Sequence, residues 1–153
     1  MEIVYIETTV VSLLVANPSR DVLIVGQQQV TRDCWQLRRA GFECITSDET
    51  RGDAEQVRLR FGLLAGLPSL SITPEIENLA VEFLRTGALP AAARSDAIHL
   101  AVATTARADY LLTWNCRHLA NATMRASIES VCASKKFKAP IICTPEEMMG
   151  VKP

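Results

Sequence analysis

The seven residues IVYIETT (residues 3–9) decide the class of fold. The first four are all apolar, which is typical of a strand buried on both faces inside a parallel sheet. The acid Glu7 follows this run directly, and the hydroxyls of Thr8 and Thr9 are candidate caps for a helix that reaches Ala16. We therefore expect a central strand that passes straight into a helix, with a carboxylate at the junction.

Short apolar runs and longer helical segments alternate along the rest of the chain. Strands are predicted at residues 42–46, 70–72, 110–113 and 141–143, and helices at residues 21–40, 48–65, 74–85, 96–107, 124–134 and from 145 onward. We expect Val30, Trp35 and Leu37 on the apolar side of the helix at 21–40, and Ser95 as the cap of an almost wholly apolar helix from Asp96. The alternation predicts a single α/β domain over residues 1–153 with a largely parallel sheet.

The composition excludes several classes of protein. Hydrophobic residues make up 48% of the 153 residues and charged residues 22%, so the chain is too apolar to be disordered. The five cysteines form no CxxC pair, which argues against a disulfide framework or a structural zinc site. We find no basic leader and no run near the roughly 20 apolar residues of a membrane span, so we expect a cytoplasmic protein without a membrane segment. The net charge of -1 does not favour nucleic acid, but it says nothing about local charge.

Acidic and amide side chains follow the predicted strands at the places where ligands bind in parallel sheets. Glu7 follows the first strand, Asp48 and Glu49 follow the second, Asn115 follows the fourth, and Asp96 opens the buried helix. Carboxylates that converge in this way repel each other unless a cation sits between them, and oxygen ligands suit Mg²⁺ or Mn²⁺. The pattern indicates metal-assisted phosphodiester hydrolysis. The alternative is that each acid only caps a helix.

Four segments also carry a family resemblance. They read VYIETTVVS (residues 4–12), SDETRGD (47–53), SDAIHLA (95–101) and LLTWNCRHLAN (111–121), and ICTPEEM (142–148) closes the series. Each resembles one motif of the PIN-domain ribonucleases, in the same order and over nearly the whole chain. One such motif would be weak evidence, whereas four in register are fairly specific.

The resemblance implies a three-layer α/β/α sandwich with a central, mostly parallel sheet of about five strands. It implies a metal-dependent endoribonuclease that binds Mg²⁺ or Mn²⁺ in an acidic pocket and cleaves RNA. It further implies the VapC-type toxin of a type II toxin–antitoxin system, with an antitoxin protein as partner and a homodimer as assembly. Carried over residue by residue, Glu7 is the first metal ligand, Asp48 the acid of the second motif, Asp96 the central ligand, and Asn115 a ligand or the residue that orients a metal-bound water.

Three of these positions depart from the usual pattern of the family. Glu7 stands for the more usual Asp, and Asp48 for the more usual Glu, with Glu49 beside it. Asn115 is neutral where many members have Asp, and a neutral oxygen binds a cation more weakly. The number of metals and the activity of the site therefore stay open.

Further residues near the motifs are candidates for supporting or substrate-binding roles. His99 lies three residues after Asp96, on the same helix face, and is expected to orient that carboxylate, to contact substrate, or to be a satisfied core histidine. Trp114 either stacks on an unpaired base or packs under its loop. Candidates for contacts to a backbone phosphate are Arg20, Arg94, Arg117, His118 and the basic run at residues 135–138, for which a surface role is the alternative. Thr8 and Ser12 could donate to a phosphate or to a metal-bound water, with helix capping as the alternative for Thr8, and Glu49 is a candidate for supporting the site.

Two other functions remain open at this point. The departures at Glu7 and Asn115 are compatible with a catalytically weak or inactive PIN-like module that binds RNA or protein. A phosphohydrolase of small molecules would use the same site chemistry. Dinucleotide, nucleoside triphosphate and serine hydrolase enzymes are disfavoured, since the chain has no GxGxxG, Walker or GxSxG motif.

Overall fold

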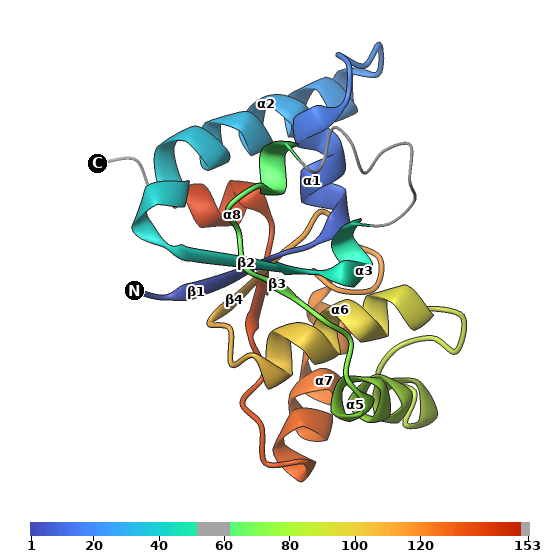
Figure 1. The fold of residues 1–153 in the computed structure, drawn as a ribbon. Coiled ribbons are helices and arrows are strands. Elements are labelled where there is room, and N and C mark those ends of the chain that lie inside the picture. Colours follow the sequence, from blue (N-terminus) through green and yellow to red (C-terminus); the bar gives the residue numbers. More distant parts are fainter. Residues whose placement is uncertain (52–61, 151–153) are drawn as a thin grey trace.

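Strand β1 (Ile3–Ile6) lies at the centre of a five-stranded sheet in the computed structural model, which describes residues 1–51 and 62–150 (Figure 1). The strand order is β3-β2-β1-β4-β5, and every neighbouring pair is parallel. The other strands are β2 (Glu43–Ser47), β3 (Ser69–Leu70), β4 (Tyr110–Leu112) and β5 (Ile141–Cys143). The α/β fold with a parallel sheet of five strands is therefore confirmed.

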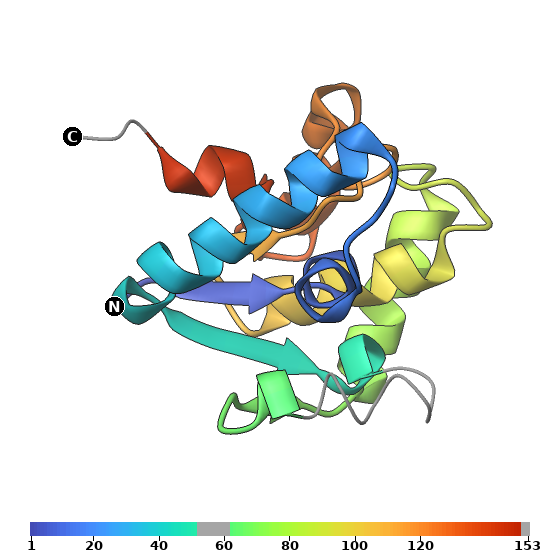
Figure 2. The same cartoon turned by 90° about the horizontal axis from the view of Figure 1, so that it is seen from above.

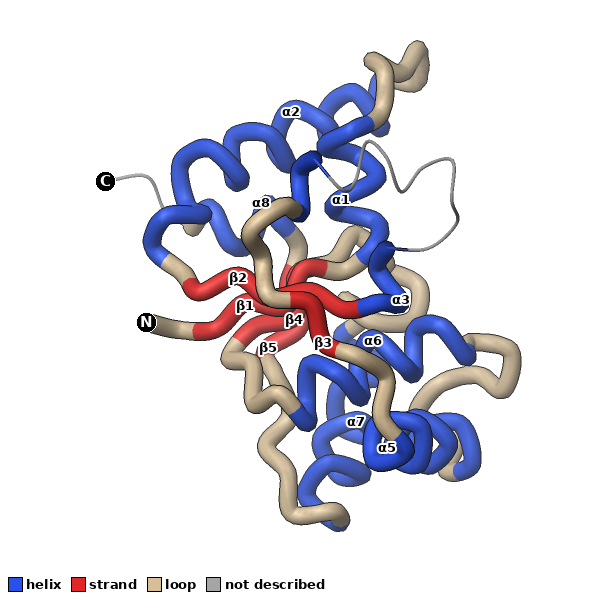
Figure 3. The backbone as a smooth tube through the Cα atoms, viewed as in Figure 1, coloured by secondary structure: helices blue, strands red, loops and turns tan. Residues whose placement is uncertain are grey.

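Helices cover both faces of this sheet, which makes a three-layer α/β/α sandwich (Figures 1 and 3). One face carries α1 (Thr8–Val15), α2 (Val22–Arg38) with the short 3-10 helix η1 (Arg39–Gly41), and α8 (Pro145–Met149). The other face carries α5 (Pro74–Arg85), α6 (Arg94–Thr105) and α7 (Ala122–Ser134), and α3 (Asp48–Arg51) begins where β2 ends. The helix predicted at 48–65 lies partly outside the described residues.

Two apolar clusters hold the layers together, one on each face of the sheet. The larger cluster is built around α6, in which every residue from Ala97 to Thr104 is buried, as its apolar sequence predicts. The smaller cluster lies under α1, α2 and α8. Strand β1 contributes to both, because Tyr5 belongs to the larger cluster and Val4 and Ile6 to the smaller one. This alternation is the burial on both faces that the first four apolar residues predict.

The predicted caps of two helices are wrong, and the reason is the same in both cases. Glu7, not Thr8 or Thr9, is the N-cap of α1, because it is the single residue between β1 and α1 and its carboxylate accepts a hydrogen bond from the Thr9 amide. Helix α6 begins at Arg94, so Ser95 lies inside the helix and does not cap it. Glu7 and Ser95 each bond a residue far away in the sequence, Thr113 and Glu49 respectively, and the local sequence does not reveal these partners.

Helix α2 begins at Val22, one residue after the predicted start, because Asp21 is its N-cap, and the buried side of the helix differs from the prediction. Leu37 is 68% exposed, whereas the buried residues are Gln28, Thr31 and Cys34. Three residues along a helix rotate the side-chain direction by about 300°, which is about 60° short of a full turn. Residues spaced three apart therefore shift gradually around the helix, and Leu37, three residues after Cys34, points away from the sheet. The prediction for Leu37 is therefore wrong, and the helical turn after Arg38 tightens into η1.

Substitution within α5 tests the larger cluster. Phe83 is fully buried, whereas Val81 on the same helix is 58% exposed. We expect Phe83→Ala to lower the free energy of unfolding by about 3–5 kcal/mol, because it removes a ring and leaves a cavity. Val81→Ala is the matched control and should change it by less than about 0.5 kcal/mol. Urea denaturation measures both, and equal losses would contradict this account of the core.

Candidate functional site

The predicted site residues gather at the carboxyl edge of the sheet. Strands β1 and β2 end side by side in Figure 2, with α3 beside their ends. Because all the strands are parallel, the segments after β1, β2 and β4 leave the sheet at the same edge. The first turn of α6 reaches this edge, since Ser95 and Asp96 contact residues that follow β2 and β4.

Glu7 is a buried carboxylate with one oxygen fixed by local donors. Its side chain is almost entirely excluded from solvent, and Oε2 accepts hydrogen bonds from the Thr9 amide at 3.0 Å and from the Thr9 hydroxyl. The hydroxyl of Thr113, which follows β4, donates to the same oxygen at 2.7 Å. The other oxygen, Oε1, lies 3.8 Å from Nε2 of His99. The α1 cap and the β4 loop therefore aim one oxygen of Glu7 toward α6.

His99 is the centre of a buried network of hydroxyl groups. Its Nδ1 lies 2.6 Å from the Tyr5 hydroxyl, and its Nε2 lies 3.1 Å from the Thr8 hydroxyl. The Tyr5 hydroxyl also lies 2.7 Å from Oγ of Ser47 at the end of β2. The network joins α6 to β1, β2 and α1, so His99 is the satisfied core histidine that the sequence suggested as one alternative.

Three carboxylates influence the pKa of this imidazole. Burial lowers the pKa of His99, because the imidazolium ion would lose its hydration, while the negative charges of Glu7, Glu49 and Asp96 oppose that effect. The loss of hydration is the larger influence, so the imidazole is held neutral among the acids. The three acids come from separate elements of the fold, and the charge of each one acts on His99.

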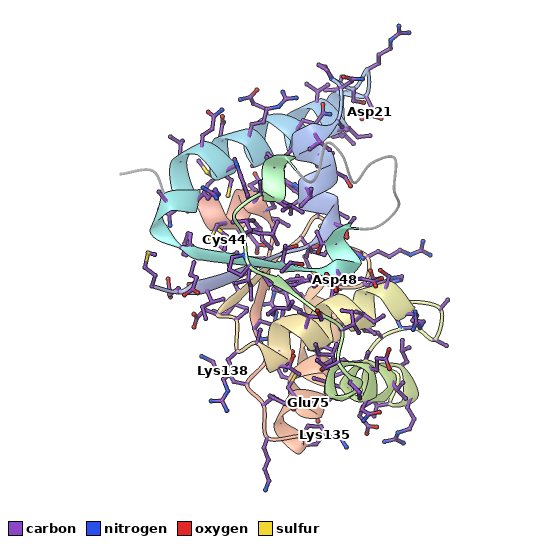
Figure 4. All side chains as sticks on the ribbon, in the orientation of Figure 1. Asp21, Cys44, Asp48, Glu75, Lys135 and Lys138 are labelled. Carbon is purple, nitrogen blue, oxygen red and sulfur yellow. The ribbon has the colours of Figure 1, made fainter. Side chains whose placement is uncertain are left out.

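The second motif contributes Glu49 to this group, and Asp48 points elsewhere. Glu49 is half-buried and accepts a hydrogen bond of 2.7 Å from the Ser95 hydroxyl in α6. Asp48 is exposed at the end of β2, where Figure 4 labels it, and accepts a hydrogen bond of 3.3 Å from Ser69 in β3. Consecutive helical residues point about 100° apart, so only one of the two acids can face α6. The sequence interpretation gave the role of the second motif to Asp48, with Glu49 only as a possible supporting residue, whereas the acid that contacts α6 is Glu49.

The loop after β4 contacts Asp96 through a histidine. Nδ1 of His118 lies 2.8 Å from Oδ2 of Asp96, and the backbone amide of His118 donates to Oδ1 of Asn115 at 3.0 Å. The sequence alone indicated a phosphate contact or a surface position for His118. The sequence feature that could have indicated this contact is the spacing of three residues between Asn115 and His118, because an Asn side chain can cap a turn of that length.

The other predicted substrate-binding residues lie in the packed interior, on the surface, or at the opposite edge of the sheet. The Trp114 indole donates to the Thr31 hydroxyl at 2.7 Å and packs against the smaller cluster, and the Arg117 side chain is exposed.

The basic run at 135–138 lies at the amino edge, where residues 136–138 line a hollow beside Asp109, the residue before β4. Figure 4 shows Lys138 and Asp48 at opposite ends of the sheet. The structure therefore does not bring the lysine run to the acids.

The donor chemistry of the carboxyl edge fits a hard divalent cation. Glu7, Glu49 and Asp96 offer carboxylate oxygens, and Mg²⁺ commonly binds through one or two carboxylates with water completing its shell. Within residues 1–51 and 62–150, no three His, Cys, Asp or Glu side chains are close enough together to form a metal site by themselves. Each acid is instead held by a hydroxyl or an imidazole.

Comparisons with known proteins do not place the chain in a family. No family model matches the chain, and a search of curated proteins finds no match. Among the helices that the structure describes, none has both the length and the apolar character needed to cross a membrane.

Removing one hydroxyl tests the buried network. We expect Tyr5→Phe to lower the free energy of unfolding by about 1–3 kcal/mol, because Nδ1 of His99 and Oγ of Ser47 lose the Tyr5 hydroxyl as their buried partner. Tyr110→Phe is the matched control, since that hydroxyl makes one exposed contact of 3.3 Å with Glu2, and its effect should stay below about 0.5 kcal/mol. Denaturant midpoints of the two variants at neutral pH measure the difference. Similar midpoints would show that the network does not contribute to stability.

Proposed function

We propose that this protein is a Mg²⁺- or Mn²⁺-dependent endoribonuclease that hydrolyses RNA phosphodiester bonds. One arrangement carries the proposal: at the carboxyl edge of a parallel sheet, Glu7 lies 3.8 Å from the buried His99 of α6, and Glu49 bonds Ser95, the residue before Asp96 in that helix. Acids concentrated in this way at a ligand-binding edge are costly unless a cation joins them. The resemblance of the four motifs to PIN-domain ribonucleases supports the same chemistry.

The residues of the chain prepare the site for an anionic substrate and a cation. Glu7, Glu49 and Asp96 supply the negative charge that would hold Mg²⁺ or Mn²⁺. When bound, such a cation offsets the negative charge that develops on a phosphate and lowers the pKa of its water. The hydroxyls of Thr9 and Thr113 fix Glu7, and His99 adds no positive charge to compete with the metal.

The exposed loop after β4 supports an RNA substrate. Arg117 is exposed in the same loop as His118, so its guanidinium is available for a backbone phosphate near Asp96. Trp114 is proposed as a packing residue and not as a base-stacking residue, because its indole already bonds Thr31. With the motif resemblance, we propose the toxin of a toxin–antitoxin pair, cytoplasmic, with an antitoxin protein and a second copy of the chain as partners.

A second candidate function is a PIN-like module that binds RNA or protein without cleaving it. It is favoured by the side-chain oxygen of Asn115, which already accepts the His118 amide, and by the absence of a preassembled three-residue metal group among the described residues. Calorimetric titration with Mg²⁺ or Mn²⁺ separates the two functions. No binding, even with RNA present, would favour the module.

The central acid gives the first test of activity. We expect Asp96→Asn to abolish metal-dependent cleavage of RNA, because it removes the charge of the acid in the first turn of α6 while keeping the shape of the side chain. Cleavage of a structured RNA is followed on gels with and without Mn²⁺, and circular dichroism checks the fold. A folded variant with full activity would refute the assignment.

The two neighbouring acids of α3 form a matched pair for a second test. We expect Glu49→Gln to slow cleavage by about 100-fold, equivalent to about 2.7 kcal/mol in the barrier, because Glu49 bonds Ser95, the residue before Asp96 in α6. Asp48→Asn should change the rate by no more than about threefold, because Asp48 is exposed and bonds Ser69. Single-turnover cleavage rates compare the two. The reverse order would return the role to Asp48.

A further inference from the structure

His118 and Asn115 lie in one turn of the loop after β4, and only one of them touches an acid of the site. The backbone of this turn is closed by Asn115, whose carbonyl accepts the amides of Leu119 at 3.1 Å and Ala120 at 2.8 Å. The Asn115 side-chain oxygen accepts the amide of His118 at 3.0 Å. Leu119 is buried and anchors the turn in the larger cluster. The position of the His118 backbone is therefore set by Asn115 and by the core.

The imidazole of His118 is the group that this turn presents to Asp96. Nδ1 lies 2.8 Å from Oδ2, and both side chains are largely shielded, with 25% exposure for His118 and 18% for Asp96. An ionised carboxylate only accepts hydrogen bonds, so Nδ1 carries the hydrogen of this contact. Oδ1 of Asp96 has no hydrogen-bond partner within the part of the chain that the structure describes. The histidine thus engages one oxygen and leaves the other for a ligand.

We infer that His118 is the positioning residue of Asp96 and that Asn115 acts on the cation site only through His118. The inference rests on the proposed metal-dependent function. It assigns Oδ1 of Asp96 as the oxygen that meets the cation, and it removes Asn115 from the set of direct ligands. Hydrogen bonds that orient a ligating carboxylate contribute roughly 10–100-fold to metal affinity.

A double-mutant cycle on Mn²⁺ affinity distinguishes this arrangement from direct ligation by Asn115. Isothermal titration with Mn²⁺ alone is carried out on the whole protein, its His118→Ala and Asn115→Ala variants, and the double variant. We expect His118→Ala to raise Kd about tenfold or more. Asn115→Ala should also raise Kd, and the double variant should match His118→Ala within about twofold, because one residue acts through the other. Losses that multiply would overturn the inference, since independent ligands contribute independently.

Two further variants keep the test specific. His118→Asn places an amide N–H near the position of Nδ1, so it should recover most of the Mn²⁺ affinity that His118→Ala loses. Lys138→Ala, at the amino edge, is the control for a surface substitution and should leave Kd unchanged. Circular dichroism verifies the fold of each variant.

The outcomes separate the inference from the function on which it rests. Wild-type protein that binds Mn²⁺, loses it in Asp96→Asn and retains it in His118→Ala would overturn the role of His118 alone. Wild-type protein that binds no Mn²⁺, with or without RNA, would overturn the proposed function and this inference together. Weak binding by His118→Ala with recovery in His118→Asn would support both.

Discussion

The buried polar contact between Tyr5 and His99 is the constraint on which the rest of this edge depends. A hydroxyl and an imidazole without exposure to water must find partners inside the protein, because an unpaired buried polar group costs about 1–3 kcal/mol. The 2.6 Å contact fixes α6 against β1, and the further contacts of these two groups bring in Ser47 and Thr8. The ends of β1 and β2 and the starts of α1 and α6 are thereby held in one arrangement.

The acids take their positions from this framework. Glu7 stands at the junction of β1 and α1, Glu49 in the first turn after β2, and Asp96 one helical turn before His99. Hydroxyl and imidazole donors hold each of them: Thr9 and Thr113 for Glu7, Ser95 for Glu49 and His118 for Asp96. These hydrogen bonds fix the direction of each carboxylate. Hydroxyl groups and an imidazole of the chain itself therefore order the site.

Local sequence patterns predicted a helix or strand well where the apolar residues of the pattern are also the buried residues of the element. The run IVYI became β1, the apolar segment after Asp96 became the buried helix α6, and Thr73–Pro74 opened α5. The predictions that were wrong, the caps at Thr8 and Ser95 and the buried side at Leu37, concern single side chains near an end of an element. At those places a tertiary partner or a small drift of the helical face decides the outcome, and neither is visible locally.

The sequence by itself determined the order of elements, the parallel sheet, and the arrival of acids at its carboxyl edge, because apolar runs and the residues that follow them are local information. The tertiary structure alone decided that Glu49 faces α6 while Asp48 faces β3, and that His118 and not Asn115 contacts Asp96. These choices depend on the direction of individual side chains across 21, 22 and 46 positions of sequence. Only the packing of α6 against the strand ends sets those directions.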